Sequence, residues 1–315
     1  GDIDTLMNIE SLRSSLHDDV LIGSDKDNSF RIEGGNNKVD GGLGTDRINY
    51  KTRQAGGVTV DLDAGTATNA LGGTDTLTSI EDVRGSRFDD VITGDSNDNR
   101  LDAGDGDDVI KGGAGDDRLE GGDGRDLLIG GSGDDLLIGG DEVVAAFDHR
   151  NRADYRDATG GIDANLSATA TVTGDSSVGT DTLVRIDQVI GSEFDDVFVA
   201  DKSFRDVAGG KSIRIEGRGG DDTIIGNGST KAFYKSAKAA VTVDLEAGIA
   251  RGTDAGDVAG VGTDTLSGID KIVGSDFDDT ILGSDGYYRE ELQGNAGNDY
   301  IDGRGGGDRA SYLMD

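Results

Sequence analysis

The sequence predicts an all-β protein built from short strands joined by turns rich in glycine and aspartate. The first observation is a nine-residue repeat that runs through residues 85–140 six times without a gap. The second is an aliphatic residue at the eighth position of every unit, which a loop without a core would not keep. The third is the composition, with 54 glycines, no proline and only 5% aromatic residues among 315. These features favour stacked turns and strands over an ordinary globular domain.

Each position of the repeat has a distinct predicted role. The glycines at positions 1, 2 and 4 permit positive φ and let the backbone approach a ligand closely. Positions 7 to 9 form a short strand whose middle residue points inward, following the two-residue period of β structure. Position 8 carries Ile92, Leu101, Ile110, Leu119, Leu128 and Leu137. Position 6 carries Asp90, Asn99, Asp108, Asp117, Asp126 and Asp135. Main-chain carbonyls and carboxylates together suit a hard cation such as calcium.

The units that begin at Gly112, Gly121 and Gly130 match the pattern G-G-x-G-x-D-x-U-x in full, where U is aliphatic. This pattern resembles the hemolysin-type calcium-binding nonapeptide of the RTX (repeats-in-toxin) family. The resemblance implies a parallel β-roll, a β-helix-like solenoid with short strands and calcium-binding Gly/Asp turns. It also implies Ca²⁺ as the cofactor and export by type I secretion.

The resemblance further implies a ligand set, because two units make one coil and units n and n+2 stack on one edge. Unit n would supply the carbonyls of positions 2 and 4 and the side chain of position 6. Unit n+2 would complete the calcium site with the carbonyls of positions 1 and 3 and its own position-6 side chain. One implied site consists of Gly104, Gly106, Asp108, Gly121, Asp123 and Asp126. The next consists of Gly113, Gly115, Asp117, Gly130, Ser132 and Asp135, and Gly112, Ala114, Gly122 and Gly124 complete the turns. Weaker pairs are Asp90 with Asp108 and Asn99 with Asp117. A forward partner for Asp126 is doubtful, because Val144 stands at the expected position.

Three further tracts contain less regular units. The first has four units, starting at Ser14, Gly23, Ile32 and Gly41, with Asp19 and Asp46 as ligand candidates. Asparagine replaces aspartate in its other two units, which lowers the ligand charge and predicts weaker binding. The later tracts contribute Asp196, Asp222, Asp279, Asp299 and Asp308. Counting usable stacked pairs gives roughly eight calcium ions in total.

A larger repeat contains these tracts. The segment GTDTL precedes a new tract at Asp75, Asp181 and Asp264, and a tyrosine closes a tract at Tyr50, Tyr155, Tyr234 and Tyr312. These markers divide the chain into four expected modules, residues 1–50, 51–140, 141–230 and 231–315, of which the first and last look truncated. The strand-like segments between the tracts are expected to form wider coils that continue the same parallel stack. The chain therefore looks like a segment of a longer repeat protein.

The charge predicts that metal binding and folding are one event. Acidic residues number 63 against 30 basic ones, for a net charge of −33, and hydrophobic residues make up 34%. Such a chain buries too little apolar surface to offset the entropy of ordering unless cations neutralise its carboxylates. The charge also disfavours nucleic acid and anionic membranes as partners. Cysteine is absent, and neither a membrane span nor a signal peptide is visible.

Nothing in the sequence indicates catalysis. The two histidines are His17, in a degenerate unit, and His149, in a polar insertion, and no HExxH, GxSxG or phosphate-loop pattern occurs. We therefore expect a non-enzymatic, secreted, extracellular calcium-binding region of a larger protein. One alternative is an adhesin or surface-layer segment that self-associates through neighbouring repeat modules or binds polysaccharide, for which the basic cluster Arg150, Arg152 and Arg156 is a candidate contact. The other is the repeat portion of a secreted polysaccharide-modifying enzyme, protease or lipase.

Overall fold

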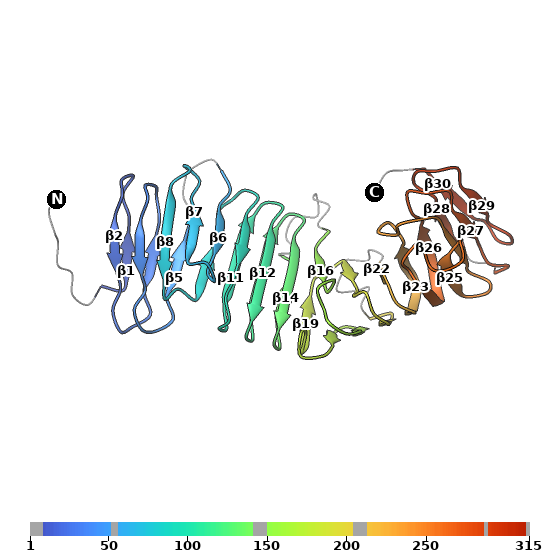
Figure 1. The fold of residues 1–315 in the computed structure, drawn as a ribbon, viewed down its shortest axis with the longest axis horizontal. Helices are drawn as coiled ribbons and strands as arrows, with labels where there is room; N and C mark the ends of the chain where they lie inside the picture. The colour runs from blue at the N-terminus through green and yellow to red at the C-terminus, as the bar shows by residue number, and fades with distance from the viewer. Residues whose placement is uncertain (1–8, 52–55, 141–149, 204–212, 287–288, 313–315) are drawn as a thin grey trace. The chain divides into compact units, whose positions relative to one another are not determined.

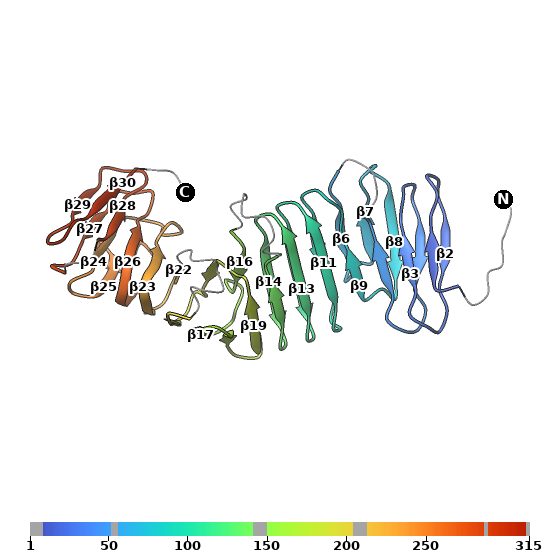
Figure 2. The same ribbon diagram turned by 180° about the vertical axis from the view of Figure 1, so that it is seen from behind.

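The computed structural model describes residues 9–51, 56–140, 150–203, 213–286 and 289–312, and these residues contain thirty β-strands (Figures 1 and 2). They fall into two compact units, residues 1–151 and 152–315, and each is described by itself. In the described ranges there is no helix with the length and apolar character that crossing a membrane requires.

Unit 1 contains the first fifteen strands, most of them only three residues long. They are β1 (Ser11–Arg13), β2 (Val20–Ile22), β3 (Ser29–Arg31), β4 (Lys38–Asp40), β5 (Arg47–Asn49), β6 (Thr59–Asp61), β7 (Thr66–Thr68), β8 (Thr74–Thr78), β9 (Asp82–Arg84), β10 (Val91–Thr93), β11 (Arg100–Asp105), β12 (Val109–Ala114), β13 (Arg118–Asp123), β14 (Leu127–Ser132) and β15 (Leu136–Ile138). In β10 and β15 the short length follows from the sequence, since each covers only positions 7 to 9 of its unit, whereas β11 to β14 continue through positions 1 to 3 of the next unit.

The strands of unit 1 form two ladders in which parallel pairing joins residues eighteen positions apart in the regular tract. One ladder includes β9, β11, β13 and β15, and the other includes β10, β12 and β14. The register pairs Leu101 with Leu119 and Leu119 with Leu137. Two nonapeptides therefore make one coil, and the predicted parallel β-roll is confirmed.

The core of unit 1 lies between the two ladders. The position-8 side chains of the regular tract are all fully buried, namely Ile92, Leu101, Ile110, Leu119, Leu128 and Leu137. Because each coil contributes two of them, the aliphatic residues stack in two columns. The period of nine in the sequence is thus the period of the core.

Each strand-rich segment between tracts forms an antiparallel meander, so the prediction of wider parallel coils is wrong. In unit 1, β6, β7 and β8 pair antiparallel, and only the outer strands continue the roll, β8 on β4 and β6 on β10. The physical reason is the short connection between β6 and β7, in which Gly65 (φ +65°) donates a hydrogen bond to the carbonyl of Leu62 (3.1 Å). A tight turn can join only antiparallel strands, since a parallel connection needs a long crossover.

Unit 2 repeats this construction with its own fifteen strands. They are β16 (Arg152–Asp154), β17 (Asp163–Leu166), β18 (Ala170–Thr173), β19 (Thr180–Val184), β20 (Gln188–Ile190), β21 (Val197–Ala200), β22 (Ile213–Glu216), β23 (Thr223–Phe233), β24 (Val241–Asp244), β25 (Ile249–Gly252), β26 (Thr263–Val273), β27 (Thr280–Leu282), β28 (Glu291–Gln293), β29 (Tyr300–Asp302) and β30 (Arg309–Ser311). β17–β18–β19 and β24–β25–β26 are antiparallel meanders, whereas β21–β23, β27–β29 and β28–β30 are parallel pairs.

Candidate calcium sites

The position-6 side chains form hydrogen-bonded columns along the edges of the roll. Oδ1 of Asp108 accepts a bond from the backbone N–H of Asp90 (2.7 Å), and Oδ1 of Asp126 accepts one from Asp108 (3.1 Å). On the other edge, Oδ1 of Asp117 accepts from the N–H of Asn99 (2.7 Å), and Oδ1 of Asp135 from Asp117 (2.8 Å). The structure therefore brings together the side chains of units n and n+2, and it uses one carboxylate oxygen of each aspartate to do so.

The second oxygen of several of these carboxylates is buried without a hydrogen bond. Among the described residues this holds for Oδ2 of Asp46, Asp108, Asp117 and Asp222, whose residues are at most 2% exposed. Burial raises the pKa of Asp108 to about 8, of Asp117 to about 7 and of Asp222 to about 9. Buried polar groups normally have partners, and a buried charge needs a counter-charge. These oxygens are therefore ready ligands for a cation.

Main-chain carbonyls converge on the same places. A Cβ atom added at Gly112 would lie 2.2 Å from Oδ2 of Asp117 and 2.5 Å from the carbonyl oxygen of Gly130. A Cβ at Gly131 or Gly133 would lie 2.0 Å from the carbonyl oxygen of Gly113 or Gly115. The carbonyls of positions 2 and 4 thus point toward the next coil.

The stacked turns around Gly104 and Gly106 repeat this geometry. A Cβ atom at Gly122 would lie 1.9 Å from the carbonyl oxygen of Gly104, and one at Gly124 would lie 1.9 Å from that of Gly106. Gly122 and Gly124 have φ values of +109° and +139°, which L-residues with side chains rarely adopt. A side chain at either position would both strain the backbone and occupy the space that the carbonyls face.

The position-3 carbonyls already have partners in the backbone. Asp123 accepts a hydrogen bond from the N–H of Gly106 (2.8 Å), and Ser132 accepts one from Gly115 (2.9 Å). A carbonyl has a second lone pair, so these bonds leave room for a metal contact. No group of three or more acidic or histidine side chains gathers at one point in the described ranges. A metal at these turns would therefore depend on carbonyl oxygens as well as on carboxylates, which is the donor set that calcium accepts.

Three of the predicted aspartates differ from the others, because a serine at position 2 holds both of their oxygens. Ser86 donates from its N–H to Oδ2 of Asp90 (2.6 Å) and from its hydroxyl to Oδ1 (2.8 Å). Ser192 binds Asp196 and Ser275 binds Asp279 in the same way. The sequence signal is G-S-x-F-D-D, which occurs at all three places. In these turns, hydrogen bonds from the serine already satisfy both carboxylate oxygens.

The remaining predicted ligands lie in more open turns or have unexpected partners. Asp19, Asp299 and Asp308 are only half-buried. Above Asp126, the side-chain oxygen of Asn151 accepts the N–H bond (2.9 Å) that a position-6 residue of the next coil would accept. Val144, considered for that place, lies outside the described residues.

Sequence reasoning missed several acidic residues that take position-6 places. Asp75 accepts the N–H of Asn37 (3.0 Å), Asp264 accepts that of Asp222 (3.2 Å), and Glu81 accepts that of Asp46 (2.8 Å). The signal was present, because A-G-V-G-T-D-T-L-S at residues 259–267 is the nonapeptide with alanine in place of its first glycine. The GTDTL markers are therefore themselves repeat units.

The comparison with protein families agrees with this geometry. Residues 15–48, 70–110, 111–142, 214–230, 264–286 and 287–310, more than half of the chain, match the family described as RTX calcium-binding nonapeptide repeat (4 copies). The chain belongs to the RTX family. RTX nonapeptide repeats bind calcium, so calcium is the cofactor of this β-roll. A comparison with curated proteins gave no match.

In this RTX roll, replacing Asp117 by alanine is expected to raise the calcium midpoint of folding, since losing a charged partner costs on the order of 1.5–3 kcal/mol. Asp117 stacks on both Asn99 and Asp135, so two adjacent sites should weaken together. The control is Asp63→Ala, which removes one exposed carboxylate in the turn after β6. Calcium titrations followed by circular dichroism measure both midpoints, and equal midpoints would contradict the assignment.

Proposed function

We propose that the chain is a calcium-triggered folding and spacing region of a larger secreted protein, and that it has no catalytic role of its own. The observation that carries this proposal is the set of buried, unpartnered carboxylate oxygens at Asp46, Asp108, Asp117 and Asp222. Without cations these charges oppose the packing of the coils, and with calcium they hold the coils together. The RTX family supports an extracellular location after type I secretion. The chain has no cysteine, so calcium would take the stabilising place that disulfides hold in many secreted proteins.

The described residues contain little that points to chemistry. His17 is exposed, and His149 with its neighbour Asp148 lies outside the described residues. In the basic cluster, Arg156 forms an ion pair with Asp154 (2.5 Å), whose side chain is fully buried. That arginine therefore balances a nearby aspartate rather than facing a ligand.

The proposal is tested by far-UV circular dichroism during a calcium titration of the chelator-treated protein, with magnesium as the control. We expect a cooperative coil-to-β transition in millimolar calcium, the range of extracellular modules, and none with magnesium. A full β spectrum in chelator would show that the strands fold unaided, and the switch would be rejected.

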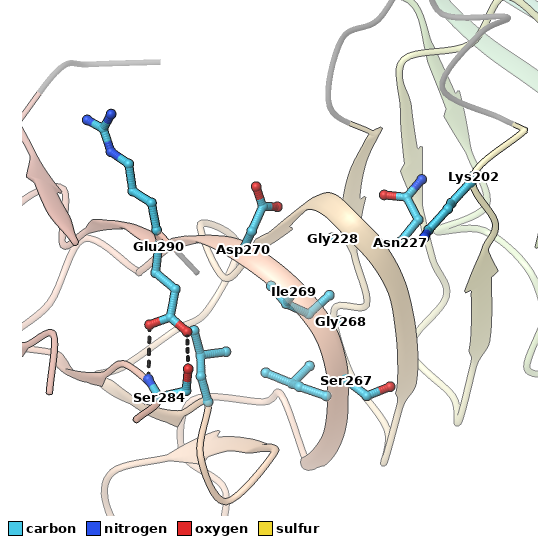
Figure 3. Close-up of a pocket in the computed structure, with 12 residues that line it drawn as sticks. Lys202, Asn227, Gly228, Ser267, Gly268, Ile269, Asp270, Ser284 and Glu290 are labelled. Carbon is cyan, nitrogen blue, oxygen red and sulfur yellow. Dashed lines mark hydrogen bonds between the residues drawn. The ribbon is translucent and has the colours of Figure 1, made fainter. Parts of the chain in front are cut away.

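A second candidate function, binding of polysaccharide, is favoured by a pocket in unit 2. Its volume is about 740 Å³, and its polar lining includes Asn227, Ser267 and Asp270 (Figure 3). It forms where the register of the β23–β26 pair shifts, between Ile225 and Lys231 of β23. Glu290 is held by the N–H (2.9 Å) and hydroxyl (2.5 Å) of Ser284, whereas Oδ1 of Asp270 is buried without a hydrogen bond.

Carboxylate, amide and hydroxyl groups around a pocket suit the hydroxyls of a sugar. A glycan array probed with the calcium-loaded protein and with its Asp270→Ala variant tests this candidate. Binding that the variant loses would support it, and an array without binding would reject it.

A further inference from the structure

Two joints between a meander and a repeat coil share the TDTL motif but differ in the residue on which its aspartate stacks. In each, an aspartate of a TDTL strand stacks on a position-6 residue of the preceding coil. In unit 1, Asp75 of β8 stacks on Asn37, and in unit 2, Asp264 of β26 stacks on Asp222. Both aspartates are at most 1% exposed. The first joint pairs a carboxylate with an amide, and the second pairs two carboxylates.

The joint at Asp75 is satisfied by hydrogen bonds alone. The side-chain amide of Asn37 donates to Oδ1 of Asp75 (2.7 Å), and the hydroxyl of Tyr50 donates to Oδ2 (3.0 Å). The amide of Asn69 donates to the carbonyl of Gly35 (2.8 Å) and lies 3.5 Å from Oδ2 of Asp75. Gly35 holds position 4, whose carbonyl the ligand scheme assigns to calcium. The Asn69 amide therefore stands where a cation would be.

The joint at Asp264 also has an aspartate carboxylate and a position-4 carbonyl, but it has no amide side chains in the places of Asn37 and Asn69. The carbonyl oxygen of Gly220 would lie 2.0 Å from a Cβ at Gly262, as that of Gly35 would lie 2.1 Å from one at Gly73. Val258, which is 58% exposed, stands at the sequence place of Asn69.

Asp222 supplies a carboxylate in place of the Asn37 amide. It is 1% exposed, and its Oδ2 has no hydrogen-bond partner. That oxygen would lie 1.9 Å from a Cβ at Gly217, so it faces the same turn. A buried pair of like charges is strongly unfavourable unless a cation or a proton offsets it.

We propose that the joint at Asp75 does not hold the calcium ion that the RTX ligand scheme would place there, because the amides of Asn37 and Asn69 take the place of the cation. The joint at Asp264 lacks these amides and keeps the oxygen donors of the RTX scheme, so a calcium ion there would fasten the third meander to its coil. The inference rests on the proposed function and adds the TDTL strand to the ligand set. A divalent cation neutralises both carboxylates at once and accepts the carbonyl as a further oxygen ligand. The two joints would then respond differently to chelation, with β8 remaining paired to β4 after the β23–β26 joint has opened.

The test is the calcium count of the folded protein, measured by native mass spectrometry at saturating calcium. Asp264→Asn is expected to bind one ion fewer than the parent protein. The matched control Asp75→Asn, at the same place in the same motif, is expected to keep the parent count. An unchanged count for Asp264→Asn, or a loss in the control as well, would overturn the proposal.

A transplant variant keeps the proposal falsifiable if Asp264→Asn does not fold. Asn37→Asp together with Asn69→Val gives the joint at Asp75 the chemistry of the joint at Asp264, and the calcium count should rise by one. A count that stays at the parent value would overturn the proposal by this route. A parent protein that binds no calcium would instead defeat the proposed function itself, so the two failures are distinguishable.

Discussion

In the absence of calcium, lowering the pH through the range from about 9 to about 6 is expected to stabilise the rolled form of the protein. The range is set by buried carboxyls, with pKa values raised to about 9 for Asp222, about 8 for Asp108 and about 6 for Asp135. Desolvation by burial is the main cause in each case. Because these folded-state values lie above the ordinary value of 3.8, the folded form holds more protons than the unfolded chain. Stability is therefore gained as the pH falls through them and lost as the pH rises.

With calcium present, the effect of pH on folding is expected to reverse. Protons and calcium compete for the same carboxylate oxygens, so the calcium midpoint should rise as the pH falls through the same range. Circular dichroism in chelator across pH and calcium titrations at two pH values measure the two trends. The Asp222→Asn variant, which lacks the group with the highest of these pKa values, should show a smaller pH dependence in chelator. Trends of the same sign in chelator and in calcium would contradict the assignment of these carboxylates as ligands.

Replacing Leu119 by alanine is expected to destabilise the calcium-saturated protein by about 2–5 kcal/mol, the usual cost of a large-to-small change in a packed core. Leu119 is fully buried and stacks between Leu101 and Leu137, so the cavity cannot be filled from either neighbouring coil without disturbing the column. The matched control is Leu127→Ala, the same change at the partly exposed position 7 of β14. It should cost about 1 kcal/mol or less.

Urea unfolding in saturating calcium measures both variants of the roll. We expect a lower midpoint and an unchanged slope for Leu119→Ala, because the surface exposed on unfolding stays the same. Equal effects of the two substitutions would contradict the predicted inward direction of position 8.

The regular part of the roll could be predicted from the sequence, because the residue that repeats every nine positions there is also the core residue. Every aliphatic residue at position 8 between Ile92 and Leu137 is buried, and the position-6 residues stack as the eighteen-residue coil requires. The antiparallel meanders could not be inferred from strand alternation alone, which is the same in parallel and antiparallel pairs. The short turn that ends at Gly65 decided the direction.

The site could be predicted less completely, because carboxylates of the same sequence position differ in their partners. Asp90 and Asp108 both hold position 6, yet Ser86 binds both oxygens of Asp90 while Oδ2 of Asp108 has no partner in the described part of the chain. Asp75, Glu81 and Asp264 were missed because their units lack glycines that the full pattern requires or have shortened turns. Only the stacking along an edge shows that they continue the columns.

The eighteen-residue stacking constrains how such a gene can change in length. An insertion or deletion of two units leaves every later strand on its own ladder, so the sequence could lengthen or shorten by recombination between like coils without a new contact. The gain or loss of a single unit would exchange the two ladders for all coils that follow and move the next inserted meander to the opposite sheet. Lineages of this roll should therefore differ in size by multiples of a whole coil.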